Sequence, residues 1–357
     1  MSKPSFLKPS AGWLLVFIPV SLAAGPLVHQ PVVVFVAACL AIIPLAGSIG
    51  RATDQLAIRA GPRVGGLLNA TFGNVTELII AVLLVRAGEF EVVKASLVGS
   101  ILGNLVLVLG AAYFAGGLRF SEQRFSARMT AVHASSLLLA VIALMMPAVF
   151  VLSQPDTRVE REVISVTVAG VLIVLYAAGL LFTLVTHSRL LRPFRSPAEE
   201  ERPQWSLARS VVVLLLAAVA VGVESELLVR SLEPTVLALG VSRLFVGLFV
   251  VAVVGNAAEH AAAVTFALRD RMDVSIEIAF GSSTQIALLV APLLVFVSLA
   301  LGRPMDFIFA TPEIVAVALA TLVTSVISMD GRSTWLEGLQ LLGVYIILGV
   351  SLFYIRA

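Results

Sequence analysis

Charge-free apolar segments long enough to cross a bilayer recur along the whole sequence. Residues 13–28 and 211–223 hold no ionisable side chain, and the chain as a whole is 59% hydrophobic with a mean hydropathy of +1.03. Because lipid offers no partners for backbone N–H and C=O groups, such segments cross as helices of roughly 20 residues. The sequence therefore predicts an all-α integral membrane protein surrounded by lipid, with no separate soluble domain.

Charged and Pro/Gly-rich breaks divide the sequence into eleven predicted spans. The break between the first two depends only on His29, Gln30 and Pro31, and a single helix there would reverse every later span. The predicted spans are residues 12–29, 31–49, 64–86, 92–116, 128–152, 162–187, 207–231, 237–267, 275–301, 308–328 and 335–355.

Positive charges in the loops predict the orientation. With a cytoplasmic N-terminus and eleven spans, sixteen Lys and Arg residues fall inside and eight outside, which agrees with the positive-inside rule and places the C-terminus outside. The net charge of +2 comes mainly from these inner loops, so it requires no nucleic-acid partner. Three lysines against twenty-one arginines are typical of a GC-rich bacterial genome and favour a bacterial inner (plasma) membrane.

Two short frames recur 182 residues apart. Gly73-Asn74-Val75-Thr76-Glu77 is repeated as Gly255-Asn256-Ala257-Ala258-Glu259, and Gly99-Ser100 is repeated as Gly281-Ser282 at the same offset. Each long frame puts a glutamate inside a predicted span, where a charge costs several kcal/mol and indicates a functional site. Two such glutamates in matched frames predict a duplicated protein whose halves share one site.

The offset also predicts the direction of the two copies. It places the third span on the eighth and the fourth on the ninth, and a shift of five spans reverses the direction of crossing. We therefore expect an extra N-terminal helix (residues 1–30), a first five-helix repeat (31–187), a cytoplasmic linker (188–206) and a second, inverted five-helix repeat (207–357). Secondary transporters built this way hold their substrate at the repeat interface.

Oxygen atoms dominate the side chains near both glutamates. In each frame asparagine precedes glutamate by three residues, so amide and carboxylate share a helical face, and the Gly-Asn pair is expected to loosen the backbone. Hard divalent cations such as Ca²⁺ prefer carboxylate, amide and hydroxyl oxygens. We expect Glu77 and Glu259 to bind the cation. The predicted lining residues are Asn74, Ser100, Asn104, Asn256, Ser282 and Gln285.

The same two carboxylates can bind protons when the cation leaves, because two like charges in a poorly hydrated site repel each other. Competition between Ca²⁺ and H⁺ for the same oxygens is an antiport mechanism. The sequence therefore predicts a secondary transporter, not an enzyme, with Ca²⁺ and protons as substrates and no resident cofactor.

Other ionisable residues have two readings each. His260 follows Glu259, whereas Leu78 fills the matching place in the first frame, so His260 is either an interhelical hydrogen-bond donor or a proton-handling group. His133 is read as structural. Three acids are expected at solvated helix ends or along an access route, with Glu226 and Asp54 as candidates for gating. These acids are Glu224, Glu226 and Asp54.

At these frames the chain resembles the calcium/proton exchanger (CAX) family of the calcium/cation antiporter superfamily. The matching stretches are residues 73–78 with 96–104, and residues 255–260 with 281–286. The resemblance implies one extra helix with two inverted five-helix repeats, alternate binding of cation and protons at Glu77 and Glu259, and long gating helices at spans two and seven. Asp54 stands where the family more usually has glutamate, and only Glu199 to Glu201 remain of its acidic segment between the halves.

Three alternatives remain beside this interpretation. A sodium-driven calcium exchanger would share the fold but would be expected to carry a further acid where Ser283, Thr284 and Gln285 stand. A cation channel would need a ring of acids, which the duplication within one chain makes unnecessary. A zinc protease would need His-Glu-x-x-His, and no second histidine stands four residues from His260. The order of preference among cations, and whether the protein is a monomer or a homo-oligomer, stay open.

Overall fold

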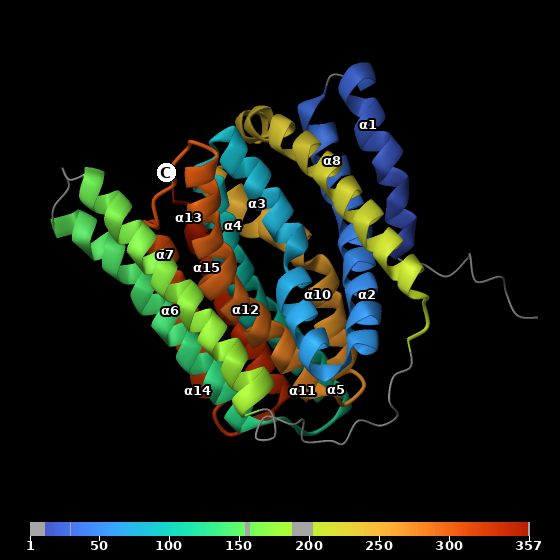
Figure 1. The fold of residues 1–357 in the computed structure, drawn as a ribbon, viewed down its shortest axis with the longest axis vertical. Coiled ribbons are helices and arrows are strands. Elements are labelled where there is room, and N and C mark those ends of the chain that lie inside the picture. Colours follow the sequence, from blue (N-terminus) through green and yellow to red (C-terminus); the bar gives the residue numbers. More distant parts are fainter. Residues whose placement is uncertain (1–10, 29, 154–157, 188–202, 356–357) are drawn as a thin grey trace, which may run out of the picture.

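The structure is a computed structural model that describes residues 11–28, 30–153, 158–187 and 203–355 (Figure 1). Within these ranges nine helices are long and apolar enough to cross a membrane, and Gly12–Ala24 and Thr311–Ile327 are shorter apolar helices. The prediction of an all-helical membrane protein with eleven spans is confirmed. The predicted linker lies almost wholly outside the described residues, with Glu199 to Glu201.

The chain alternates long α-helices with short π-helical segments, which are η3 to η7. In chain order the elements are η2 (Ala11–Val16, a 3-10 helix), α1 (Phe17–Val28), α2 (Pro31–Phe72), α3 (Val75–Ala87), α4 (Phe90–Leu102), η3 (Gly103–Val108), α5 (Leu109–Arg119), β1 (Gln123–Arg124), α6 (Ala127–Ser153), α7 (Arg158–Leu181), η4 (Phe182–Thr186), α8 (Leu207–Leu239), α9 (Arg243–Phe245), η5 (Val246–Val251), α10 (Ala252–Ala267), α11 (Met272–Ile276), η6 (Glu277–Gly281), α12 (Ser282–Gln285), η7 (Ile286–Val290), α13 (Ala291–Ala300), α14 (Thr311–Ile327), β2 (Arg332–Ser333) and α15 (Trp335–Phe353).

Helices α2 and α8 are longer than the sequence predicted, and they pack side by side with α1 against them (Figure 1). The second span does not end at residue 49 but runs to Gly61, where a backbone φ of 77° kinks the helix. Likewise α8 runs to Leu239 rather than residue 231, and the next span begins at Arg243 rather than residue 237. Polar residues were taken as breaks, but a helix extends through them wherever its backbone bonds continue.

Helices α3, α4 and α10 lie between the α1/α2/α8 group and the α6/α7 pair (Figure 1). Burial reflects this arrangement, because 83% of the most apolar stretch of Phe90–Arg119 is buried, against 11% of that of Glu160–Thr186. The apolar residues left exposed on α6, α7 and α15 form the surface that meets lipid. The span that carries Ser100 and Asn104 is therefore the centre of the molecule.

Glycine allows the closest approach between the two halves of the chain. A Cβ added at Gly99 on α4 would lie 2.1 Å from the carbonyl oxygen of Leu248 in η5, and one added at Gly247 would lie 2.6 Å from the Cβ of Ala95. Only a residue without a side chain fits at such distances. These contacts fix α4 against the span that contains α10.

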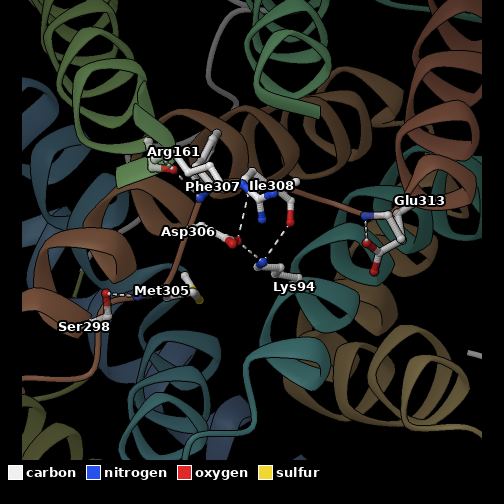
Figure 2. A network of polar contacts seen from close by, with 10 residues as sticks. Lys94, Arg161, Ser298, Met305, Asp306, Phe307, Ile308 and Glu313 are labelled. Carbon is white, nitrogen blue, oxygen red and sulfur yellow. Dashed lines mark hydrogen bonds and ion pairs between the residues drawn. The ribbon is translucent and has the colours of Figure 1, made fainter. Parts of the chain in front are cut away.

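Two polar clusters join loops at the ends of the helices. In the first, Lys94 pairs with Asp306 and donates to the Ile308 carbonyl at 2.7 Å, while Ser298 and Ser165 accept from the backbone N–H groups of Met305 and Phe307 (Figure 2). These bonds attach the α13–α14 loop (residues 301–310) to α4 and α7. In the second cluster β1 pairs antiparallel with β2, and Arg332 contacts Glu122 at 3.0 Å.

Candidate cation site

The two glutamate frames fold differently. In the first copy α2 ends at Phe72 and α3 begins at Val75, so the helix is interrupted at Gly73 and Asn74. In the second copy α10 continues through Gly255 and Asn256. The prediction of a loosened backbone is therefore right for the first frame and wrong for the second.

The interrupted frame is bonded to the opposite half of the chain. Ala70, just before the interruption, offers its carbonyl oxygen to the Gln285 side-chain amide and, at 3.3 Å, to the Tyr176 hydroxyl. These donors compensate backbone groups that an unbroken helix would satisfy internally. Gln285 thus reaches from α12 to the backbone of the other half, which is the position the sequence predicted for a lining residue.

Asparagine and serine side chains pair across the two copies. The Ser282 hydroxyl donates to Asn74 Oδ1 at 2.9 Å, and Asn256 Nδ2 donates to the Ser100 hydroxyl at 2.9 Å. These two contacts exchange under the offset of 182 residues, since each asparagine meets the serine of the opposite copy. Asn104 Nδ2 adds a bond to Ser282 at 3.1 Å. Five of the predicted lining residues therefore lie in one connected group.

The two carboxylates meet beside Gly255. A Cβ added there would lie 3.1 Å from Glu77 Cγ and 3.6 Å from its Oε1, so the absent side chain gives Glu77 its room. Glu259 lies one helical turn further along α10, close enough for the two charges to interact. A small cavity of about 10 Å³, lined in part by Glu77, Ser96 and Ser100, provides room for about one water-sized ligand.

Several buried oxygens near the carboxylates have no hydrogen-bond partner among the described residues. They are Glu259 Oε2, Asn104 Oδ1 and Asn256 Oδ1. Buried polar atoms without partners are costly in a folded protein, which points to a ligand that supplies the missing contacts. Across the described ranges no group of three or more His, Cys, Asp or Glu side chains could hold a metal ion, so amides and hydroxyls must complete any cation shell. That donor set suits a hard cation.

Comparisons with known proteins agree with this geometry. A family model described as sodium/calcium exchanger protein matches residues 30–185 and 209–354. The Ca(2+)/H(+) antiporter of Synechocystis sp. is 46% identical over 361 residues, which cover 96% of both chains. The chain belongs to the calcium/proton exchangers of the sodium/calcium exchanger family. The Ca(2+)/H(+) antiporter ChaA of Bacillus subtilis is 42% identical to this exchanger, with 99% of both chains covered.

A solved structure has the same fold as the exchanger. Native YfkE superposes with a TM-score of 0.85 at 37% identity, and the match covers 97% of this chain and 100% of that one. The exchanger is accordingly a secondary transporter and not an enzyme, as the sequence predicted.

The residues proposed for gating lie in three different surroundings. Glu226 on α8 pairs with Arg230 at 2.9 Å and lines a cleft of about 520 Å³ between α8 and α3, together with Arg86. Asp54 lies exposed in the middle of the long α2 helix and not at a helix end. Glu224 is 1% exposed, so its placement at a solvated helix end was wrong; the extra helix α1 packs there and excludes water.

His260 lies at the edge of the cation site. A Cβ added at Gly103 would be 3.7 Å from its Cε1, and its buried Nε2 has no hydrogen-bond partner among the described residues. The expected interhelical hydrogen bond from Nε2 is therefore not formed in this conformation. The proton-handling interpretation of His260 stays a prediction.

Two contacts escaped the sequence interpretation. His133, read as structural and without a partner, lies 3.3 Å from Glu277 on η6, and Glu313 accepts from the Ala310 N–H at 2.8 Å at the start of α14. Both glutamates fall inside predicted spans, so the rule that a charge in a span marks a functional site could have found them. Attention to the repeated frames hid them, because neither lies in a repeated frame.

Proposed function

We propose that the exchanger moves Ca²⁺ against protons at a single site shared by Glu77 and Glu259. The observation that carries this proposal is the crossed bonding of Asn74 to Ser282 and of Asn256 to Ser100, which draws both frames into one oxygen-rich group. The listed names of its relatives, Ca(2+)/H(+) antiporters, support the choice of substrates.

The proposed mechanism is competition for the same oxygens. A Ca²⁺ ion would use both carboxylates together with the unpartnered oxygens of Asn104 and Asn256, which supply part of the six to eight oxygens that Ca²⁺ prefers. Protons on Glu77 and Glu259 neutralise the pair when the cation is absent, so the site never keeps two uncompensated charges. Ca²⁺ and protons therefore exclude each other.

The proposed domain arrangement is one extra helix (residues 1–30) followed by two inverted repeats (31–187 and 207–357), joined by a linker (188–206). Support comes from the offset of 182 residues, which an odd number of spans separates, and from the exchange of the asparagine–serine bonds under it. The distribution of Lys and Arg supports a bacterial inner membrane with the N-terminus in the cytoplasm and the C-terminus outside.

Protons rather than sodium are the proposed counter-ion. A sodium-driven exchanger would be expected to carry a further acid near Gly281 and Ser282, and this chain has the neutral Ser283, Thr284 and Gln285. Gln285 is already bonded to Ala70, and Thr284 donates to the Phe280 carbonyl at 2.7 Å.

The test is transport by the full chain in liposomes. We expect a proton gradient alone to drive Ca²⁺ uptake, and we expect Glu77→Gln and Glu259→Gln each to abolish it. The matched control is Glu160→Gln, since Glu160 is an exposed acid in the first turn of α7. Retained transport in either glutamine variant would refute the shared site, and transport driven only by sodium would refute the counter-ion.

A further inference from the structure

A second ionisable group lies inside the membrane spans, apart from the two carboxylates of the cation site. His133 on α6 places Nε2 3.3 Å from Glu277 Oε2 on η6, and Nδ1 3.4 Å from the Thr284 hydroxyl on α12. Neither His133 nor Glu277 belongs to the repeated frames. The arrangement therefore belongs to the second half of the chain alone.

The hydrogen-bond pattern fixes the charge of His133. The Thr284 hydroxyl has one hydrogen and donates it to the Phe280 carbonyl at 2.7 Å, so its oxygen can only accept from Nδ1. An ionised Glu277 carboxylate can only accept from Nε2. Both ring nitrogens must then donate, and this occurs only in the doubly protonated imidazolium. The observed pattern is that of the proton-bound state.

Water has access to the pair from one side of the membrane. Glu277 keeps 52% of its side chain exposed, whereas His133 keeps 14%. A carboxylate exposed to lipid would cost several kcal/mol, and Glu277 turns toward α6, so its open face meets an aqueous route. It lies five residues after Met272, roughly 7.5 Å along the helix axis from the α10–α11 loop (residues 268–271).

The pair is also adjacent to the cation site. A Cβ added at Gly281 would lie 3.5 Å from Glu277 Oε1 and 4.0 Å from His133 Cε1. The next residue, Ser282, bonds to Asn74 and Asn104 within the site. The aqueous route that reaches Glu277 thus ends one residue from the cation ligands.

We propose that His133 and Glu277 form a second proton-binding site that controls cation access from the side of the α10–α11 loop. With a proton on His133, the imidazolium neutralises Glu277 and the carboxylate does not attract a cation. When His133 loses that proton, Glu277 is left as a negative charge beside Ser282, and it draws a divalent cation toward the site. The proposal rests on the exchange function above but adds a separate pH response.

Few other charges can influence this pair. On its own elements, Arg128 is exposed at the start of α6, and Asp273 lies at the start of α11. Among the neighbours of η6, α10 brings Glu259 and His260, and η3 has no ionisable side chain. Helices α7 and α14, which pack on α6, carry charges only in their first two turns, at the opposite membrane face. Histidine is the side chain among these that changes charge near neutral pH.

The experiment measures the apparent KM for Ca²⁺ on the α10–α11 loop side of sided vesicles, between about pH 5.5 and 7.5, the range in which histidine titrates. His133→Gln removes the charge at every pH, so we expect a KM several-fold below wild type at acid pH and a flatter pH profile. His133→Arg keeps a permanent charge, so we expect a KM several-fold above wild type at neutral pH. A merely structural role would move both variants in the same direction.

Further variants separate this proposal from folding effects and from the main site. Glu277→Gln should raise KM at every pH, and adding His133→Gln to it should change nothing more. Ser135→Ala is the matched control on α6, because Ser135 is exposed and bonds only to its own helix at Val132. If His133→Gln does not fold, Thr284→Val removes the Nδ1 acceptor and should shift the profile in the same direction, by less.

The proposal is overturned if His133→Gln and His133→Arg shift KM the same way, or if they change only the maximal rate with the wild-type pH profile. Failure of the exchange function would instead appear as transport by Glu77→Gln or Glu259→Gln. The two outcomes are distinguishable, because the His133 variants are measured in protein that still transports Ca²⁺.

Discussion

The two glutamate frames share a pattern but use their glycines for different purposes. At Gly73 the backbone leaves the helix, and Gln285 from the other half of the chain bonds to the carbonyl of Ala70 beside the interruption. At Gly255 the helix continues, and the missing side chain makes room for Glu77. The comparison teaches that a sequence repeat predicts which residues meet, while the neighbours decide what the backbone does.

The π-helical segments show the same partial symmetry. Under the offset of 182 residues η3 at Gly103–Val108 falls on η7 at Ile286–Val290, but η5 and η6 correspond to α-helical stretches of the first half. A π turn widens the helix and often marks a functional site. In the second half η6 ends at Gly281, directly before Ser282, so the wider turns flank the cation ligands there.

The largest expected difference between the copies is at the repeated Gly-Ser pair. Gly99→Ala would place a Cβ 2.1 Å from the Leu248 carbonyl oxygen, so we expect a loss of about 3 kcal/mol or more and little folded protein. At Gly281→Ala the nearest atom, Glu277 Oε1, is 3.5 Å away, so we expect folded protein. Thermal unfolding of both variants in detergent measures the contrast, and equal damage would show that the copies pack alike.

A smaller difference is expected at the serines. Ser282 bonds to both Asn74 and Asn104, whereas Ser100 bonds to Asn256. Each hydrogen bond is worth about 1 kcal/mol, so Ser282→Ala should weaken Ca²⁺ binding about tenfold and Ser100→Ala less. Calorimetric titration of the two variants tests this order. A stronger effect at Ser100 would contradict the assigned contacts.

The smallest expected effects are at the two loop clusters. Lys94 is 15% exposed and bonds to both Asp306 and Ile308, whereas Arg332 is 52% exposed in its pair with Glu122. Because water screens exposed pairs, Lys94→Met should lower the unfolding midpoint by several degrees and Arg332→Met should hardly change it. A larger effect at Arg332 would show that the loop on that side carries more of the stability.

The exposed pair also has a pH signature. Hydrogen bonding to Arg124, with a further contribution from Arg332, holds the pKa of Glu122 below its usual value. A carboxyl with a lowered pKa in the folded state stabilises above its unfolded pKa, and this contribution is lost as the pH falls through the lowered value. The small difference between wild type and Arg332→Met should therefore vanish in acid. A difference that persists there would assign it to packing.

The sequence predicted the spans and the central residues well, because apolar length and charges in spans are local properties. Glu77, Glu259 and the asparagine–serine partners could be named from the two frames and their offset. The burial of Glu224 could not be predicted, since it depends on where α1 packs. Nor could the interrupted backbone at Gly73, because the same Gly-Asn pair stays helical at Gly255.

The central claim is that Glu77 and Glu259 form one site, and the number of Ca²⁺ ions bound per chain tests it most directly. Calorimetric titration of purified wild type at alkaline pH, against Glu77→Gln and Glu259→Gln with Glu160→Gln as control, gives that number. A shared site predicts one Ca²⁺ per chain in wild type and control and none in either glutamine variant. Two ions in wild type, with one retained in each single variant, would contradict it.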